Sequence, residues 1–364
     1  MASSASSPPA DTAAAPTMKC VLASELGDID KVLSMSTDAP RPTANLKKGE
    51  MLVKVQACSL SRGDTIMLSG ACDRVMGPPQ FPFVPGMDVC GVVEEVADDC
   101  KRFKVGDRIM GTNGMMPVGG LAEYMVVPIK QAVKAPDNLD AVQTASMPNS
   151  PMTAMLVVRA AKIKEGDRVM ILGGSGGVGT ALIQLAKDAK ASFVAATSTD
   201  EPLLTSLGAD RVIDYRETNW WEDTAFKAEP FDTVVDCVGW RDEWKEAAKH
   251  RVLKSGWHGG RYIVIATTDK PEFHSIWQGV KMFVPVLWRS SWTSLIRTRP
   301  GYSLVISDPA EKDFDELAEL VRTGRVKPVL EAKSPFPFTL DGVKGAFELQ
   351  ASRHAHGKVV VSMS

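Results

Sequence analysis

The first 249 residues of this chain of 364 contain no histidine, and all five histidines lie between positions 250 and 356. The six cysteines are widely spaced and form no Cys-x-x-Cys pair. A catalytic zinc site needs three protein ligands, drawn from cysteine, histidine and acidic side chains. We therefore predict no metal site, and we interpret His354 and His356 as part of a polar turn. The cysteines are interpreted as reduced thiols, which predicts a cytoplasmic protein.

Two further features are missing. No run approaches the ~18 consecutive apolar residues typical of a membrane span, and the net charge of −2 gives no electrostatic case for nucleic acid. Residues 1–17 hold one acidic and no basic residue, without the charged start and apolar core of a secretory signal. We predict that residues 1–17 are a disordered tail, with an organelle-targeting remnant as the alternative, and that folding begins near Met18.

The pattern of apolar residues changes once along the chain, near Pro148. Before it, short alternating runs are separated by glycine and proline, which predicts a β-barrel-like unit. After it, strand-like and helix-like segments alternate, which predicts right-handed βαβ units and a parallel sheet. A chain of this length suggests about two domains.

A glycine-rich motif stands at the start of the second unit. Four apolar residues, Val169–Leu172, precede the turn Gly173–Gly179, and an apolar helix follows. The spacing Gly-x-Gly-x-x-Gly is typical of dinucleotide binding, because its glycines allow a tight turn, close approach of a pyrophosphate and close packing of helix on strand. Unpaired N–H groups at the helix start favour phosphate. The predicted cofactor contacts here are Gly174, Ser175, Gly176, Gly177, Val178 and Gly179.

Further short motifs occur along residues 18–364. They are Ala57–Asp64, Pro85–Val93, Phe103–Arg108, Gly119–Tyr124, the glycine turn, Ser206–Asp210, Val212–Tyr215, Gly324–Pro328 and Gly357–Val360. In this order they resemble a zinc-independent medium-chain dehydrogenase/reductase of the quinone oxidoreductase type. The resemblance implies an α/β protein with a GroES-like β-barrel domain (residues 18–147 and 310–364) and an inserted Rossmann domain with a doubly wound parallel sheet (residues 148–309). Where related zinc enzymes have Gly-His-Glu, this chain has Gly86-Met87-Asp88.

The resemblance and the residues together predict NADPH as the cofactor. Enzymes that use NAD commonly hold the ribose with an acid about 20 residues after the glycines, whereas this chain has the hydroxyl pair Thr197 and Ser198. These two side chains also suit a helix N-cap. Asp200 lies close by and weakens the NADPH preference. The resemblance places Tyr215 beside the 2′-phosphate and Thr153 close to the nicotinamide, and we add Gly239 at the end of the fourth strand.

The catalytic prediction is Ser61, as a polar contact near the nicotinamide or the substrate oxygen, together with Asp64. The alternative for Asp64 is the cap of a helix beginning at Thr65. The resemblance implies reduction of quinones or α,β-unsaturated carbonyls without zinc. One alternative is a 2-enoyl thioester reductase, although such enzymes usually use a tyrosine near this loop and none precedes Tyr124. The other is a non-catalytic NADPH-binding sensor or scaffold.

One region fits none of these motifs. All eight tryptophans lie between positions 220 and 292, and no acidic residue occurs between Glu272 and Asp308. Pro285 predicts an interruption of any long helix there. Three interpretations stay open: a lid for a bulky apolar substrate, a homodimer interface with Tyr302–Ile306 as an edge strand, and, least favoured, a peripheral membrane contact. We predict a homodimer acting on a small-molecule quinone or enone.

Overall fold

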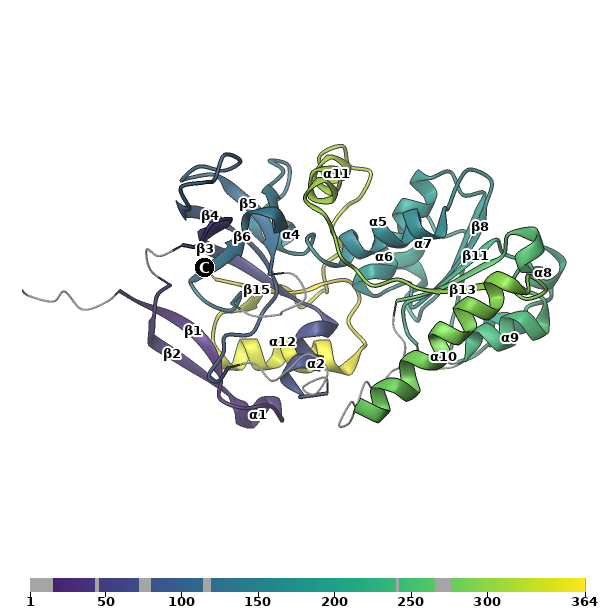
Figure 1. Cartoon of the computed structure of the whole chain (residues 1–364), viewed down its shortest axis with the longest axis horizontal. Helices are drawn as coiled ribbons and strands as arrows, with labels where there is room; N and C mark the ends of the chain where they lie inside the picture. Colours follow the sequence, from purple (N-terminus) through teal and green to yellow (C-terminus); the bar gives the residue numbers. More distant parts are fainter. Residues whose placement is uncertain are drawn as a thin grey trace, which may run out of the picture.

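The computed structural model describes residues 16–42, 46–71, 80–113, 119–239, 242–265 and 276–363, with only the backbone described for 276–283. The predicted tail therefore lies almost wholly outside the described residues. Two units lie side by side along the long axis of the molecule (Figure 1). Among the described residues, no helix has the length and apolar character that a membrane crossing requires.

The first unit is built mainly on antiparallel strands, and its β14–β15 pair is parallel. The strand order is β14-β15-β3-β4-β5-β7, with β6 paired to β3 and a separate hairpin of β1 and β2. The bounds of these strands are β1 (Thr17–Ala23), β2 (Leu33–Pro40), β3 (Glu50–Leu60), β4 (Asp88–Val96), β5 (Arg108–Thr112), β6 (Tyr124–Pro128), β7 (Ala132–Lys134), β14 (Phe336–Pro337) and β15 (Val359–Ser362).

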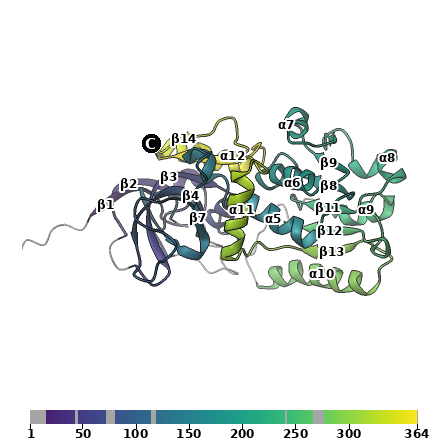
Figure 2. The same cartoon turned by 90° about the horizontal axis from the view of Figure 1, so that it is seen from above.

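The second unit holds a six-stranded sheet in the order β10-β9-β8-β11-β12-β13, with every pair parallel. Numbered from β8, this order is 3-2-1-4-5-6, the arrangement of doubly wound dinucleotide-binding sheets. Most of it can be followed edge-on in Figure 2. The strands are β8 (Arg168–Leu172), β9 (Phe193–Thr197), β10 (Arg211–Ile213), β11 (Thr233–Asp236), β12 (Arg261–Val264) and β13 (Gly301–Leu304).

Helices bury both faces of this parallel sheet. In β8, Val169 and Ile171 face a core that includes residues of helices α5, α6 and α11, while Met170 and Leu172 face a second core rich in aromatic residues. A strand that is buried on both sides has a continuous run of apolar residues, as β8 does.

The α-helices of the described residues are α1 (Ile29–Val32), α2 (Arg62–Leu68), α4 (Ala141–Ala145), α5 (Ser150–Ala161), α6 (Gly177–Asp188), α7 (Glu201–Ser206), α8 (Thr224–Ala228), α9 (Glu243–His250), α10 (Ile276–Leu295), α11 (Glu311–Arg322) and α12 (Leu340–Ser352).

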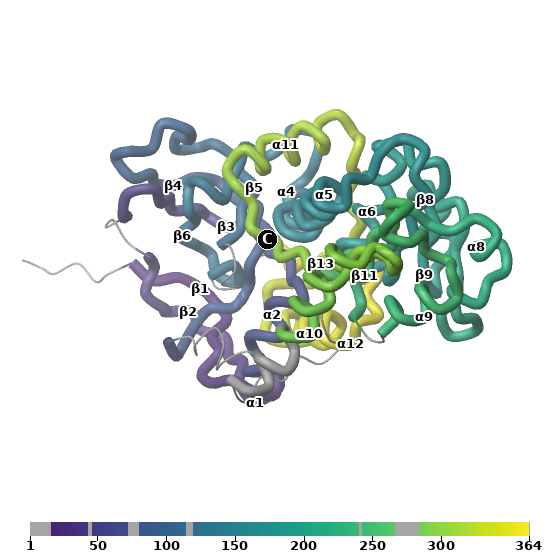
Figure 3. The backbone as a smooth tube through the Cα atoms, turned by 45° about the vertical axis from the view of Figure 1, so that its right-hand side comes forward, coloured from purple at the N-terminus to yellow at the C-terminus, as the bar shows by residue number. Residues whose placement is uncertain are grey.

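The C-terminal segment returns to the first unit, as the resemblance implied. Strand β15 pairs antiparallel with β3, and α12 lies against α2. Figure 3 shows this yellow segment among the blue and purple barrel elements. Helix α11 stands between the units: Arg102 of the barrel pairs with Glu311 at 2.6 Å, and Arg159 of α5 pairs with Asp313 at 2.8 Å. The exact boundaries at 147/148 and 309/310 stay predictions.

Helix α10 corrects one expectation. It runs unbroken through Pro285, where we expected an interruption. Pro285 is exposed, so its ring does not have to fit into an apolar core, and the helix continues although Pro285 cannot donate a backbone hydrogen bond. The inward side of α10 is fixed by Val286 and by Thr293, whose hydroxyl accepts a hydrogen bond from the Tyr302 N–H at 3.0 Å. Its outward side is apolar and exposed.

Candidate active site

The glycine turn lies between β8 and α6, at the carboxyl edge of the sheet. A side chain on Gly174 would lie 2.7 Å from the Ala196 methyl carbon, and one on Gly179 would collide with the Gly173 carbonyl oxygen. Gly173 itself has φ of +79°, which favours glycine. At Gly176, by contrast, the nearest atom to an added side chain is 3.6 Å away. Glycine at 174 and 179 is thus required by packing, while glycine at 176 leaves space open.

That open space suits a diphosphate. Gly176 is the N-cap of α6, and no side chain caps the helix start. The first N–H groups of α6, in the segment that holds Gly177 and Val178, therefore have no side-chain acceptor and face the space above Gly176. Uncapped N–H groups, a helix N-terminus and a gap that a Cβ would fill fit the pyrophosphate of a dinucleotide. Ser175 contributes its backbone carbonyl to a hydrogen bond from the Gly357 N–H at 2.8 Å.

Thr197 and Ser198 lie at the end of β9, but both are almost fully buried. The Thr197 hydroxyl accepts a hydrogen bond from the Gly173 N–H at 2.9 Å, and the Ser198 hydroxyl accepts one from the Asp200 N–H at 2.9 Å. Asp200, rather than the hydroxyl pair, is the N-cap of α7. The hydroxyl pair therefore supports the glycine turn and the following loop. Direct contact with a cofactor phosphate stays a prediction for both residues.

Two other predicted cofactor residues, Tyr215 and Gly239, follow strands of the parallel sheet, and Thr153 lies in a helix. Tyr215 follows β10 and is 39% exposed, so its ring is available to a ligand. Gly239 has φ of +69° and donates its N–H to Asp236 Oδ1 at 2.8 Å. Asp236 also accepts a hydrogen bond from the Tyr262 hydroxyl at 3.0 Å. Its carboxylate therefore stabilises the turn after β11 and a buried tyrosine of the core. Thr153 is a buried residue in the first turns of α5.

The predicted catalytic pair lies at the start of α2. Ser61 is the N-cap, and Asp64 Oδ2 accepts from the Ser61 N–H at 2.7 Å and from the Ser61 hydroxyl at 3.0 Å. The helix therefore begins at Arg62 and not at Thr65, and Asp64 caps it from within the first turn. Asp64 is 1% exposed, and its second oxygen has no hydrogen-bond partner among the described residues. Burial raises the pKa of Asp64 to about 7.

A buried lysine joins this loop to the glycine turn. Lys358, which is 4% exposed, donates from Nζ to the Leu60 carbonyl at 2.9 Å and lies 3.4 Å from Asp88 Oδ2. Its Cδ lies 2.9 Å from where a Gly177 side chain would start. Burial raises the pKa of Asp88, and the nearby Lys358 ammonium opposes that rise. The sequence pointed to Asp88 only as part of a motif, and it gave no signal that Lys358 would be buried here.

Further contacts link the Ser61 loop to residues around it. The Ser61 hydroxyl lies 3.8 Å from the Met87 sulfur, and the Asn149 amide nitrogen lies 2.9 Å from the same sulfur. Arg62 Nη1 lies 3.5 Å from the Val238 carbonyl oxygen at the carboxyl edge of the parallel sheet. The loop with the catalytic pair thus faces the edge that carries the glycine turn. Within the described ranges, no group of three or more histidine, cysteine or acidic residues could hold a metal ion.

Comparison with known proteins agrees with this geometry. Residues 47–137 match the alcohol dehydrogenase GroES-like domain, and residues 207–361 match the model described as zinc-binding dehydrogenase. The chain is 32% identical to an Arabidopsis thaliana NADPH-dependent alkenal/one oxidoreductase of the chloroplast, over 99% of this chain and 83% of that protein. It is 33% identical to the Solanum lycopersicum 2-methylene-furan-3-one reductase, over 94% of this chain and 79% of that protein.

The solved structure of a quinone oxidoreductase from Coxiella burnetii has a TM-score of 0.75 and 25% identity, covering 95% of this chain and 99% of that one. A barrel and a doubly wound sheet with an open glycine turn in the cleft between them define the medium-chain dehydrogenases/reductases. The chain belongs to this superfamily, in its quinone oxidoreductase-like family. The family and the two-part fold predicted from the motifs are therefore confirmed.

Proposed function

We propose that the protein is an NADPH-dependent reductase of α,β-unsaturated carbonyls or quinones that works without zinc. The observation that carries the proposal is the shared cleft: the open turn at Gly176 and the Ser61–Asp64 pair are joined through Lys358. Relatives named as alkenal/one, furanone and quinone reductases support the substrate class. When bound, the nicotinamide supplies a hydride to an electron-poor carbon of the acceptor.

The residues of the chain supply the proton. Ser61 is half-buried at the start of α2, and its hydroxyl donates a hydrogen bond to Asp64 Oδ2 at 3.0 Å. A carboxyl with a pKa of about 7 is present in both protonation states near neutral pH, which suits a general acid. In the proposed step, Ser61 donates a proton to the reduced acceptor and Asp64 returns one to Ser61. Because Asp64 is buried and Ser61 is half-buried, solvent then restores the proton of Asp64 through the Ser61 hydroxyl. Ser61→Ala should lower kcat by 10²-fold or more, with little change in NADPH affinity.

The hydrogen-bond partners of the Asp200 carboxylate support the NADPH preference. This acid would repel a 2′-phosphate, but its Oδ2 lies 2.9 Å from His356 Nδ1, and its Oδ1 accepts from the Leu203 N–H. Both oxygens are thereby engaged away from an incoming phosphate. NADPH and NADH titrations followed by fluorescence should show tighter binding of NADPH. Equal or tighter binding of NADH would contradict the preference.

A substrate panel tests the activity. NADPH oxidation should be measured with a quinone, an enone, an enal and a 2-enoyl thioester, with and without a metal chelator. We expect turnover with the first three classes and no effect of the chelator. NADPH binding without turnover on any acceptor would indicate a sensor or scaffold, and loss of activity with the chelator would contradict the zinc-free mechanism.

We also propose that the protein is a cytoplasmic homodimer. The outward face of α10 carries large exposed apolar side chains, and Trp288 stacks on Trp292 with ring centroids 5.2 Å apart. A face of this kind is usually covered by a partner, and we prefer a second copy to a membrane or a lid. The exposed residues are Val284, Leu287, Trp288, Trp292 and Leu295. Light scattering should give a dimer that Leu287→Lys converts to a monomer, and cell fractionation tests the location.

A further inference from the structure

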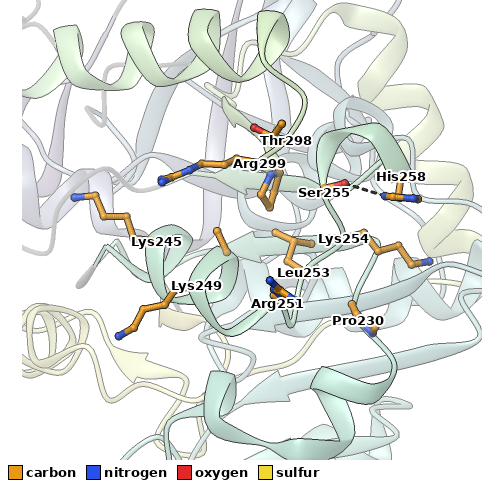
Figure 4. A pocket seen from close by; sticks show the side chains of 12 residues that line it. Pro230, Lys245, Lys249, Arg251, Leu253, Lys254, Ser255, His258, Thr298 and Arg299 are labelled. Atoms are coloured by element: carbon orange, nitrogen blue, oxygen red, sulfur yellow. Dashed lines mark hydrogen bonds between the residues drawn. The ribbon is translucent and has the colours of Figure 1, made fainter.

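A second hollow lies at the opposite edge of the parallel sheet from the glycine turn. It is a cavity of about 540 Å³, a volume within the range of small-molecule sites. Its walls come from segments that directly precede β11, β12 and β13, together with one side of α9 (Figure 4). The lining residues are Pro230, Lys245, Ala248, Lys249, Arg251, Leu253, Lys254, Ser255, His258, Thr298, Arg299 and Pro300. It belongs neither to the cofactor turn nor to the Ser61 cleft.

The charge of this lining is of one sign. Five lysine and arginine residues and one histidine line the cavity, and no acidic residue does. This is unusual in a chain whose net charge is −2. Figure 4 shows Arg251 near the middle of the hollow, with Lys245 and Lys249 on one side and Lys254 and His258 on the other. A concave surface lined by one sign of charge attracts ions of the opposite sign.

The carboxylates nearby neutralise only part of this charge. Lys245, Lys249 and Lys254 pair with Asp242, Glu246 and Asp232 at 2.7, 3.1 and 2.5 Å. Asp242 is shared with Arg289, and Glu246 is shared with His250. Arg251 and Arg299 have no carboxylate partner among the described residues. The two guanidinium groups are therefore available to an anion.

The positions of these two arginines are not explained by helix capping alone. Arg251 ends α9 with φ of +59°, where cations favour the helix C-terminus. Arg299 comes from the segment before β13 and lies over the Trp244 ring at 5.7 Å. Gly256 donates its N–H to the Arg299 carbonyl at 2.9 Å, and the Ser255 hydroxyl lies 2.9 Å from His258 Nδ1. The Gly256–Arg299 hydrogen bond joins the segments before β12 and β13, and the Ser255–His258 contact is local to the first of them.

We propose that this cavity is a binding site for a phosphate-bearing polyanion of about diphosphate size. Guanidinium groups bind phosphate oxygens in pairs of hydrogen bonds, and Arg251 and Arg299 provide two such groups in one hollow. The surrounding lysines supply long-range attraction, and the His258 and Ser255 side chains supply further polar contacts. The phosphate can belong to a free metabolite or to a lipid headgroup, because the lining recognises the same chemistry in either.

Calorimetric titration with inorganic pyrophosphate tests the proposal on the full chain at physiological ionic strength. The protein is first saturated with NADP⁺, so that the glycine turn is filled and cannot take up the pyrophosphate. Flotation with phosphatidylcholine vesicles, with and without phosphatidic acid, forms a second arm that separates a lipid source from a free one. We expect binding in at least one arm.

The variant Arg251→Gln/Arg299→Gln should weaken that binding about tenfold or more, with NADPH affinity and turnover unchanged. Lys47→Gln/Lys48→Gln, on the exposed surface of the barrel, removes the same amount of positive charge and is the matched control, which should bind as the wild type does. If the arginine variant does not fold, Lys245→Gln/Lys249→Gln carries the test, because both side chains are more than half exposed. No binding in either arm, or equal binding by the cavity variants and the control, would overturn the proposal.

Discussion

The two carboxylate oxygens of Asp64 have different surroundings. Its Oδ2 caps α2 by accepting from Ser61, while its other oxygen is buried without a described partner. The unprotonated form therefore carries a desolvation cost that the neutral form avoids, and burial raises the pKa of this carboxyl to about 7. A buried carboxyl in contact with the Ser61 hydroxyl is thus close to half-protonated at neutral pH, which is the condition for moving a proton in both directions.

This pKa predicts a pH-dependent stability difference. The folded state holds the proton of Asp64 up to about pH 7, whereas an unfolded aspartate releases it near pH 4. The stabilising contribution is therefore complete below about pH 4 and is lost as the pH rises through 7. Between pH 5 and 8, Asp64→Asn should gain about 2 kcal/mol in free energy of unfolding relative to the wild type.

Urea denaturation of both proteins at the two pH values measures this difference. The contributions of other titrating groups to the pH dependence cancel in this comparison, because both proteins contain those groups. Ser61→Ala is a useful control, since it keeps the carboxyl and should keep most of its pH dependence. A difference between wild type and Asp64→Asn that does not change with pH would show that the carboxyl is not strained by burial.

At the scale of the elements, different glycines of the turn serve packing and cofactor binding. Gly176 has φ of −70°, which any residue adopts, and its side-chain direction is open. Gly179 has no room for a side chain because the carbonyl of Gly173 occupies it. The same residue type thus serves a ligand at one position and the fold at the other.

Two alanine variants of the turn should therefore behave differently. Gly176→Ala should fold with an unchanged Tm but bind NADPH at least tenfold more weakly, because its methyl group stands where the diphosphate approaches. Gly179→Ala should lose about 1–3 kcal/mol of stability through overpacking. Thermal unfolding and a fluorescence titration of each variant provide the check. Full NADPH affinity in Gly176→Ala would place the diphosphate elsewhere.

The sequence predicted structure that one short segment specifies, but it did not predict contacts between residues far apart in the chain. The turn of Gly173–Gly179 was predictable because one strand, one turn and one helix specify it in a single short segment. The Lys358–Asp88 contact joins residues 270 positions apart, and no periodicity reports such a pair. The expected break at Pro285 was wrong, because the local rule takes no account of the solvent that the proline faces. The start of α2 was misplaced by three residues, since Ser61 and Asp64 form a reciprocal cap.

At the scale of the whole molecule, the C-terminal segment of the barrel reaches the cofactor side of the parallel sheet. His356 Nδ1 lies 2.9 Å from Asp200 Oδ2, and the neighbouring Gly357 binds the backbone of Ser175. The barrel therefore contributes to the loop that the 2′-phosphate of NADPH would approach. The proposed preference for NADPH over NADH therefore depends on residues of both units.

His356→Ala should reduce the preference for NADPH. Without its partner, the Asp200 carboxylate is free to repel the 2′-phosphate, and we expect NADPH to bind about three- to tenfold more weakly, with NADH binding nearly unchanged. His354→Ala changes an exposed histidine in the same segment and serves as the control. Parallel loss of affinity for both nucleotides would instead indicate general damage to the cleft.

The central claim is that hydride donor and proton donor meet in one cleft between the barrel and the parallel sheet. Isotope tracing with NADPH that carries deuterium on the transferred position of the nicotinamide tests it directly, with a small enone as the acceptor. The account predicts one deuterium at the carbon β to the carbonyl of the product and a solvent-derived hydrogen at the α carbon. A product without deuterium at the β carbon, formed while NADPH is consumed, would contradict it.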